Sequence, residues 1–221
     1  MKRNYLFNQI VVLILAISFF SACNKNNVVQ TDTQVGISKI TVYPVVTLNG
    51  GQYVAVAQGS NFTDPGASAT AGTDKLTVTT IGSVNTNSVG VYRLTYSAQN
   101  SDGFSASTTR YVAVYNTAAS AATNDLSGNY ARNTNGSVTT WTKIAPGVYT
   151  VFNPGGAPGT NVTVFVFNSQ NYAIQIPSQT IGDGSTMSSS EESYTNSTPA
   201  TFSWKIINTG YGASLRTFTK Q

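Results

Sequence analysis

The residue types that most often carry out chemistry in proteins are scarce in this chain. Its 221 residues include no His and a single Cys, Cys23. Without His, the commonest general base and the commonest zinc ligand are absent, and one Cys excludes disulfides within the chain. No Ser-x-x-Lys or Gly-x-Ser-x-Gly motif that would activate a serine occurs. We therefore expect neither an enzyme nor a cofactor.

Three of the eight acidic residues fall in one polar stretch, Gly182–Thr198. Oxygen ligands suit Ca²⁺, but no EF-hand-like spacing is present. Glu191 and Glu192 are adjacent, so on a strand they would point to opposite faces. We expect a solvated loop and no metal, and the candidates for the alternative, a calcium site, are Asp183, Glu191 and Glu192.

Aromatic side chains are the remaining candidates, and they indicate binding rather than catalysis. Their apolar rings can cover the C–H surface of a sugar while their polar atoms form hydrogen bonds. Each Trp has polar neighbours, as in Thr140-Trp141-Thr142, which fits both an exposed binding face and a core that is buried on one side. The sequence leaves both open. The candidate ligand-binding residues are Trp141, Trp204, Tyr149, Tyr172 and Tyr211.

The first residues have the pattern of a signal peptide. Lys2 and Arg3 precede an apolar run, Ile10–Phe20, which is shorter than the ~20 residues that span a bilayer. Small residues then precede Cys23. This pattern resembles a bacterial lipoprotein signal, which implies that residues 1–22 are removed and that Cys23 is lipidated. We therefore expect a chain anchored in the cell envelope, at the outer membrane, facing either the periplasm or the cell surface.

Charge argues against nucleic acid as a partner. The net charge is +4, and Lys2 and Arg3 of the signal contribute two of these positive charges. Charged residues make up 9% of the chain, and no basic stripe exists that could displace the counterions of a phosphate backbone. The membrane, a glycan or another outer-membrane protein are the partners we expect.

The elements that must position these residues are β-strands. In the segment Val91–Ala98, Tyr92, Leu94 and Tyr96 share one face, and this alternation predicts a half-buried strand. A turn at Asn100–Gly103 and a return strand at Thr108–Tyr115 complete a hairpin. No window has a helical period. Further strands are predicted at Ser127–Arg132, Val138–Lys143, Val148–Phe152, Val162–Phe167, Tyr172–Ile176, Thr201–Ile207 and Ala213–Thr219.

These strands predict an all-β fold with two domains. A tether, residues 23–38, leads into a first domain at 39–116. A linker of small residues, 117–125, leads into a second antiparallel domain at 126–221. We expect an immunoglobulin-like β-sandwich followed by a second sandwich or a barrel-like sheet.

Spaced motifs in both domains carry a resemblance. Asn49-Gly50, Asp64-Pro65-Gly66-Ala67 and Arg110-Tyr111-Val112 resemble a bacterial immunoglobulin-like domain, of the kind also found in insecticidal crystal toxins. Leu126–Tyr130 and Ile174–Gln179 resemble the C-terminal domain of Bacteroidota envelope lipoproteins of undefined function. The resemblance implies an accessory protein that binds or presents a ligand, with glycan capture suggested by association with polysaccharide-utilisation systems. The alternative is a spacer, docking subunit or adhesin without a small-molecule ligand.

Overall fold

The computed structural model describes residues 34–35 and 38–221. The predicted signal peptide, Cys23 and most of the predicted tether lie outside the described residues. The chain divides into two units, of which the first ends at Val42 and the second is Tyr43–Gln221. The described part of the first unit contains the antiparallel pair β1 (Gln34–Val35) and β2 (Ser38–Lys39). The second unit contains residues 43–116 of the first predicted β domain and all of the second.

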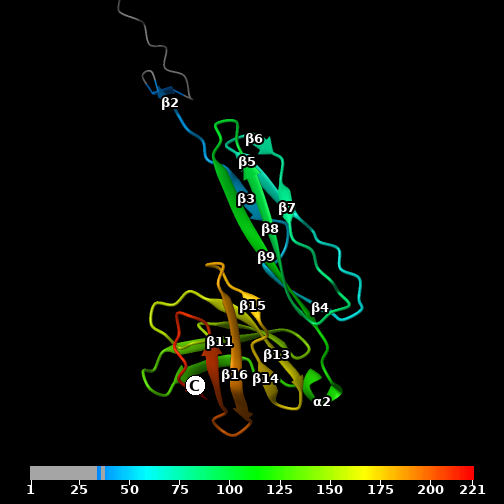
Figure 1. Cartoon of the computed structure of the whole chain (residues 1–221), viewed down its shortest axis with the longest axis vertical. Helices are drawn as coiled ribbons and strands as arrows, with labels where there is room; N and C mark the ends of the chain where they lie inside the picture. The colour runs from blue at the N-terminus through cyan, green and yellow to red at the C-terminus, as the bar shows by residue number, and fades with distance from the viewer. Residues whose placement is uncertain (1–33, 36–37) are drawn as a thin grey trace, which may run out of the picture. The chain divides into compact units, whose positions relative to one another are not determined.

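The first β domain is built from two sheets. One sheet has the order β3-β5-β6 and the other the order β4-β9-β8-β7. The predicted hairpin is confirmed as β8 and β9, which pair from Gly90↔Val114 to Gln99↔Ser105 and lie side by side in Figure 1. β4 runs parallel to β9, and the other pairs are antiparallel. The strands are β3 (Val45–Leu48), β4 (Tyr53–Ala57), β5 (Ala67–Ala71), β6 (Asp74–Leu76), β7 (Thr79–Ile81), β8 (Gly90–Gln99) and β9 (Ser105–Tyr115).

The core of this domain is small and has a charge at its edge. Leu94, Tyr96 and Val112 are its buried apolar centre, and half-buried residues pack around them. Beside Tyr96 lies Arg110, whose side chain is fully buried and pairs with the carboxylate of Asp64. The hydroxyl of Tyr96 donates to the same carboxylate at 2.7 Å.

Backbone carbonyls complete the surroundings of Arg110. Its Nε donates to the carbonyl oxygen of Gly51 at 2.9 Å, and Nη2 donates to that of Asn49 at 2.8 Å. Nη2 also reaches the carbonyl oxygen of Gly66, which has a φ of 72°. Four residues of the motifs that carry the family resemblance therefore belong to one hydrogen-bonded network that closes the edge of the core: Asn49, Asp64, Gly66 and Arg110.

The second β domain is a single nine-stranded antiparallel sheet, here called the C-terminal sheet. Its order is β14-β13-β12-β11-β10-β18-β17-β16-β15. The sheet curls until β14 contacts β16, and there the backbone N–H of Ile176 donates to Ser189 Oγ at 2.8 Å. The strands are β10 (Gly128–Arg132), β11 (Val138–Ala145), β12 (Val148–Phe152), β13 (Thr163–Gln170), β14 (Ala173–Gln175), β15 (Gln179–Thr180), β16 (Thr186–Thr195), β17 (Thr201–Ile207) and β18 (Arg216–Lys220).

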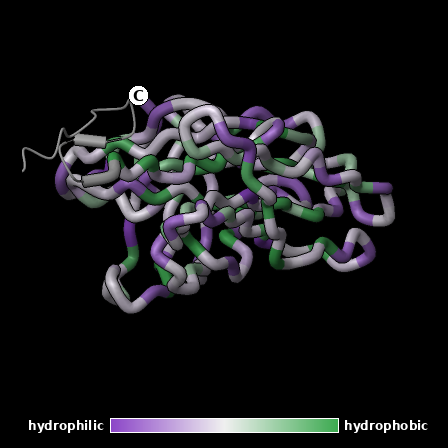
Figure 2. The backbone as a smooth tube through the Cα atoms, turned by 90° about the horizontal axis from the view of Figure 1, so that it is seen from above, coloured by the Kyte–Doolittle hydropathy of each residue, from purple (hydrophilic) through white to green (hydrophobic). Residues whose placement is uncertain are grey.

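Aromatic rings fill the interior of the curled sheet. Trp141 and Trp204 stack with ring centroids 5.6 Å apart, and Phe202 stacks on Phe218 at 4.5 Å. Trp204 Nε1 donates to the carbonyl oxygen of Pro154 at 2.9 Å. Figure 2 shows short hydrophobic and hydrophilic stretches following one another along the backbone, as expected when strands bury one face.

The prediction of a solvated loop at Gly182–Thr198 is wrong, because the strand β16 occupies most of this stretch. Met187 and Ser189 of this strand point inward and are buried. Serine, threonine and glutamate fill most of its other positions, so its alternation has little hydrophobic contrast for a sequence pattern to detect.

The stretch predicted as a linker, 117–125, packs against the C-terminal sheet. It contains the short helix α2 (Ala119–Ala122), whose Ala121 is buried. Lys143 Nζ donates to the carbonyl oxygens of Ala122 at 3.2 Å and Asn124 at 2.5 Å. The linker is therefore fixed to β11 through its backbone carbonyls.

Strand β13 is covered on both faces. Val164 and Val166 point into the aromatic interior of the C-terminal sheet. Phe165 and Phe167 point outward into a second apolar cluster, which includes Tyr111 of β9. Tyr53 of β4 meets Phe165 edge to face, with ring centroids 5.7 Å apart. The two β domains thus share an apolar contact.

Candidate functional site

Three of the five aromatic residues predicted to bind ligand are core residues. Trp141 is 1% exposed, and Trp204 and Tyr149 are fully buried. A sugar needs an open ring face, and these side chains point into the curled sheet, so the binding prediction is wrong for all three. Burying a large aromatic side chain stabilises the folded state more than leaving it exposed. The buried hydroxyl of Tyr149 still donates a hydrogen bond to the carbonyl oxygen of Asn124 at 2.7 Å.

The other two predicted residues, Tyr172 and Tyr211, are partly exposed to solvent. Tyr172 is 37% exposed, stacks on Tyr194 at 5.7 Å and accepts a hydrogen bond from Asn196 Nδ2 at 2.7 Å. Tyr211 is half-buried, and its ring lies 5.1 Å from the guanidinium carbon of Arg216. The structure thus gives these two tyrosines different neighbours.

The three carboxylates named for the alternative, a calcium site, are not brought together. Asp183 accepts from the backbone N–H of Ser185 at 2.9 Å, and this hydrogen bond lowers its pKa. Glu192 accepts from Ser189 Oγ at 2.5 Å, and Glu191 pairs with Lys205 at 2.5 Å. Nowhere in residues 34–35 and 38–221 do three His, Cys, Asp or Glu side chains meet as a metal site would require.

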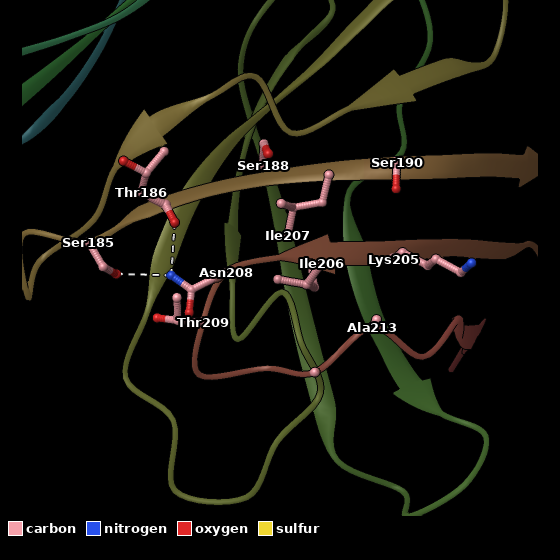
Figure 3. A pocket seen from close by; sticks show the side chains of 11 residues that line it. Ser185, Thr186, Ser188, Ser190, Lys205, Ile206, Ile207, Asn208, Thr209 and Ala213 are labelled. Atoms are coloured by element: carbon pink, nitrogen blue, oxygen red, sulfur yellow. Dashed lines mark hydrogen bonds between the residues drawn. The ribbon is translucent and has the colours of Figure 1, made fainter.

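A groove of about 650 Å³ lies on the outer face of β16 and β17 and is the candidate site. Figure 3 shows the side chains around it. One wall is β16, the floor is β17, and the other wall is the loop that follows β17. The groove is lined by Ser185, Thr186, Ser188, Ser190, Lys205, Ile206, Ile207, Asn208, Thr209, Gly212 and Ala213.

Strand pairing explains which side chains reach the groove. Ser188 pairs with Ile207, and Ser190 pairs with Lys205, so these four side chains share the outer face. Serine is short, and it therefore leaves the surface of β16 low beside the longer side chains of β17. Ile207 is 53% exposed, which gives the groove an apolar surface between hydroxyl groups.

Asn208 holds the loop that forms the far wall. Its Nδ2 donates to Ser185 Oγ and to the carbonyl oxygen of Thr186, each at 2.9 Å, as the dashed lines in Figure 3 show. Its Oδ1 accepts from the backbone N–H of Gly210 at 2.9 Å. One side chain therefore ties the beginning of β16 to the turn after β17.

A β-bulge places charge at the end of the groove. The register of β16 and β17 shifts between Ser190 and Ser193, and Glu191 within this bulge has a φ of 52°. Such a bulge re-aims the side chain it contains, and here Glu191 meets Lys205. Both side chains are partly exposed, so the pair can exchange hydrogen bonds with a ligand at little cost.

The groove presents polar and apolar groups side by side. It offers several hydroxyl groups, one ammonium, one amide and the aliphatic side chain of Ile207. The sequence patterns missed it, because its serines lie in the stretch predicted as a loop. The alternation of Ser203, Lys205 and Ile207 against Trp204 and Ile206 was the available signal for its floor.

Comparison with known proteins defines the class of the first domain. Residues 46–114 match the family described as bacterial surface protein, Ig-like domain, and the two sheets β3–β9 extend one residue beyond this stretch at each end. The predicted immunoglobulin-like domain and all-β fold are confirmed. A surface-protein domain of this kind indicates a protein of the bacterial cell envelope.

One solved structure similar to this chain is a lipoprotein from Bacteroides thetaiotaomicron. The two sequences are 22% identical, the alignment covers 81% of this chain and 100% of that one, and the TM-score is 0.43. Among curated proteins, no match to the chain was found. In the part of the chain that the structure describes, no helix has both the length and the hydropathy needed to cross a bilayer.

Proposed function

We propose that this chain is a non-enzymatic lipoprotein of the cell envelope that binds a glycan in the groove on β16 and β17. The groove carries the proposal, because it combines an exposed aliphatic side chain, Ile207, with hydroxyl groups and the Lys205–Glu191 pair. Sugars present C–H faces and hydroxyl groups that match these two kinds of surface. Its volume lies within the range of small-molecule sites, roughly 300–1,000 Å³.

Anchoring through Cys23 completes the proposal. Acyl chains attached to this residue would hold the protein at the membrane, since each buried CH₂ contributes about 0.8 kcal/mol. We place the anchor in the outer membrane. Labelling with radioactive palmitate should mark the chain and should fail for Cys23→Ser; a labelled variant would contradict the anchor.

Binding is tested with the chain from residue 24 onward, which lacks the lipid, on affinity gels containing soluble polysaccharides. Ser188→Phe fills the groove, and we expect it to abolish the retardation that a bound polysaccharide causes. Ser203→Phe is the matched control, because Ser203 faces outward on β17 but does not line the groove. If no polysaccharide retards the unmodified chain, or if both variants behave alike, the groove is not a glycan site.

A spacer or docking subunit is the second candidate. The contact that favours it is the apolar cluster shared by the two β domains, including Phe165 and Tyr111, because a spacer must resist bending. In that case the affinity gels would show no retardation, and cross-linking in cells would connect the chain to another envelope protein.

A further inference from the structure

Two arginine side chains meet at one end of the aromatic interior of the C-terminal sheet. Arg132 is the last residue of β10, and Arg216 is the first residue of β18. Nη1 of each donates to the carbonyl oxygen of Gly155, at 3.4 Å from Arg132 and 3.1 Å from Arg216. Two like charges therefore share one neutral acceptor.

Neither charge has a counterion among residues 34–35 and 38–221, where the ion pairs are Arg110–Asp64 and Lys205–Glu191. Arg216 is only 5% exposed, and the Nε atoms of both arginines are buried without a hydrogen-bond partner. Burial, together with the charge of Arg132, lowers the pKa of Arg216. An uncompensated buried guanidinium is costly, so the pair has unused capacity for a negative group.

A glycine-rich loop covers the pair. A Cβ atom on Gly155 would lie 2.6 Å from Arg216 Nη1, and one on Gly156 would lie 2.9 Å from Arg132 Cδ. The loop backbone therefore lies directly on both side chains, and Tyr211 covers Arg216 with its ring and accepts from Nη2 through its carbonyl oxygen. Arg132 is only half-buried, so it forms the open side of the pair.

We propose that Arg132 and Arg216 bind an oxyanion, a carboxylate or sulfate group. The planar fork of a guanidinium matches the two oxygens of such a group and binds it more strongly than it binds a neutral carbonyl. The anion takes the place of the glycine carbonyls as acceptor and supplies the missing negative charge. If the oxyanion is carried by a sugar, the arginine pair makes the protein select acidic glycans. This selectivity rests on the proposed function.

The test measures binding of sodium sulfate and sodium glucuronate by calorimetry, at constant ionic strength set with sodium chloride and with glucose as the neutral control. We expect both anions to bind at millimolar concentration and glucose not to bind. Arg132→Gln should weaken anion binding at least tenfold. Arg132→Lys keeps the charge without the planar guanidinium, and its affinity for the anions should lie between those of Arg132→Gln and the unmodified chain. Arg93→Gln, on an exposed side chain of β8, is the matched control and should bind like the unmodified chain.

The same measurements also distinguish anion binding at the two arginines from glycan binding in the groove. Absence of heat with both anions, or unchanged binding in Arg132→Gln, would overturn the proposal. Anion binding without retardation by any polysaccharide would support the arginine site and count against the proposed glycan function. Circular dichroism spectra that match the unmodified chain would show that the variants are folded.

Discussion

Each β domain buries an arginine, and the two differ in how the charge is compensated. Arg110 of the immunoglobulin-like domain donates through all three nitrogens and pairs with Asp64. Arg216 of the C-terminal sheet has no carboxylate partner in the described part of the chain, and its Nε is unpartnered. The comparison indicates that Arg110 holds a fold together, whereas Arg216 has binding capacity to spare.

The apolar cores of the two β domains also differ in how they are stabilised. The immunoglobulin-like domain has a small apolar centre around Leu94 and Val112 and depends on the polar network at its edge. The C-terminal sheet is filled by stacked aromatic rings. We expect the first domain to be sensitive to loss of a charge partner and the second to loss of ring volume.

The largest effect is expected for Trp204→Ala. This change removes a fully buried indole, creates a cavity and leaves the carbonyl oxygen of Pro154 without its donor. The loss should be about 5 kcal/mol in the free energy of unfolding, against about 3 kcal/mol for Leu94→Ala in the smaller core. Urea unfolding followed by circular dichroism measures both. Equal losses would contradict the difference between the cores.

Asp64→Asn should have the next largest effect. It leaves the guanidinium of Arg110 buried without a negative partner, and a loss of about 3 kcal/mol is expected because breaking a buried pair exposes its full desolvation cost. Asp74→Asn is the control on the exposed strand β6, where substitutions stay within about 0.5 kcal/mol. If the two variants unfold at the same urea concentration, the network at Arg110 does not stabilise the domain.

Whether the sequence predicts a structural feature depends on how far apart in the chain the interacting residues lie. The alternation in Val91–Ala98 predicts β8 correctly, because a strand's inward side chains recur at every second residue. The pair of Asp64 and Arg110 joins positions 46 residues apart, and no local pattern shows it. The aspartate in Asp64-Pro65-Gly66 has a turn function that hides its role in the network.

The candidate site illustrates the same limit. The polar neighbours of Trp141 and Trp204 fit either a binding face or a core, and only the curl of the whole sheet decides that both are buried. The groove needs the pairing of β16 with β17 and the return of the loop after Ile207. Its serines carry no hydrophobic contrast, so the pattern that reveals most strands is silent there.

Alkaline pH should weaken both domains through their buried tyrosines. Burial, together with the hydrogen bond to Asp64, raises the pKa of Tyr96 from 10.0 to about 12, and burial raises that of Tyr149 to about 12. Above pH 10 the unfolded chain releases these protons first, so the stability present below pH 10 is lost as the pH rises towards 12. Tyr96→Phe should flatten this decline in urea midpoints measured across that range, and an unchanged slope would refute the assignment.

The smallest effect is expected at the groove, for Glu191→Gln. The Lys205–Glu191 pair lies at the surface, with Glu191 60% exposed, and exposed pairs contribute roughly 0–1 kcal/mol. The variant should therefore unfold within that margin of the unmodified chain, and added salt should remove the remaining difference. A loss comparable to that of Asp64→Asn would mean that the bulge depends on this pair for its structure. A small loss combined with weaker retention of polysaccharide would assign the pair to ligand binding, because a side chain that stabilises little can still contact a ligand.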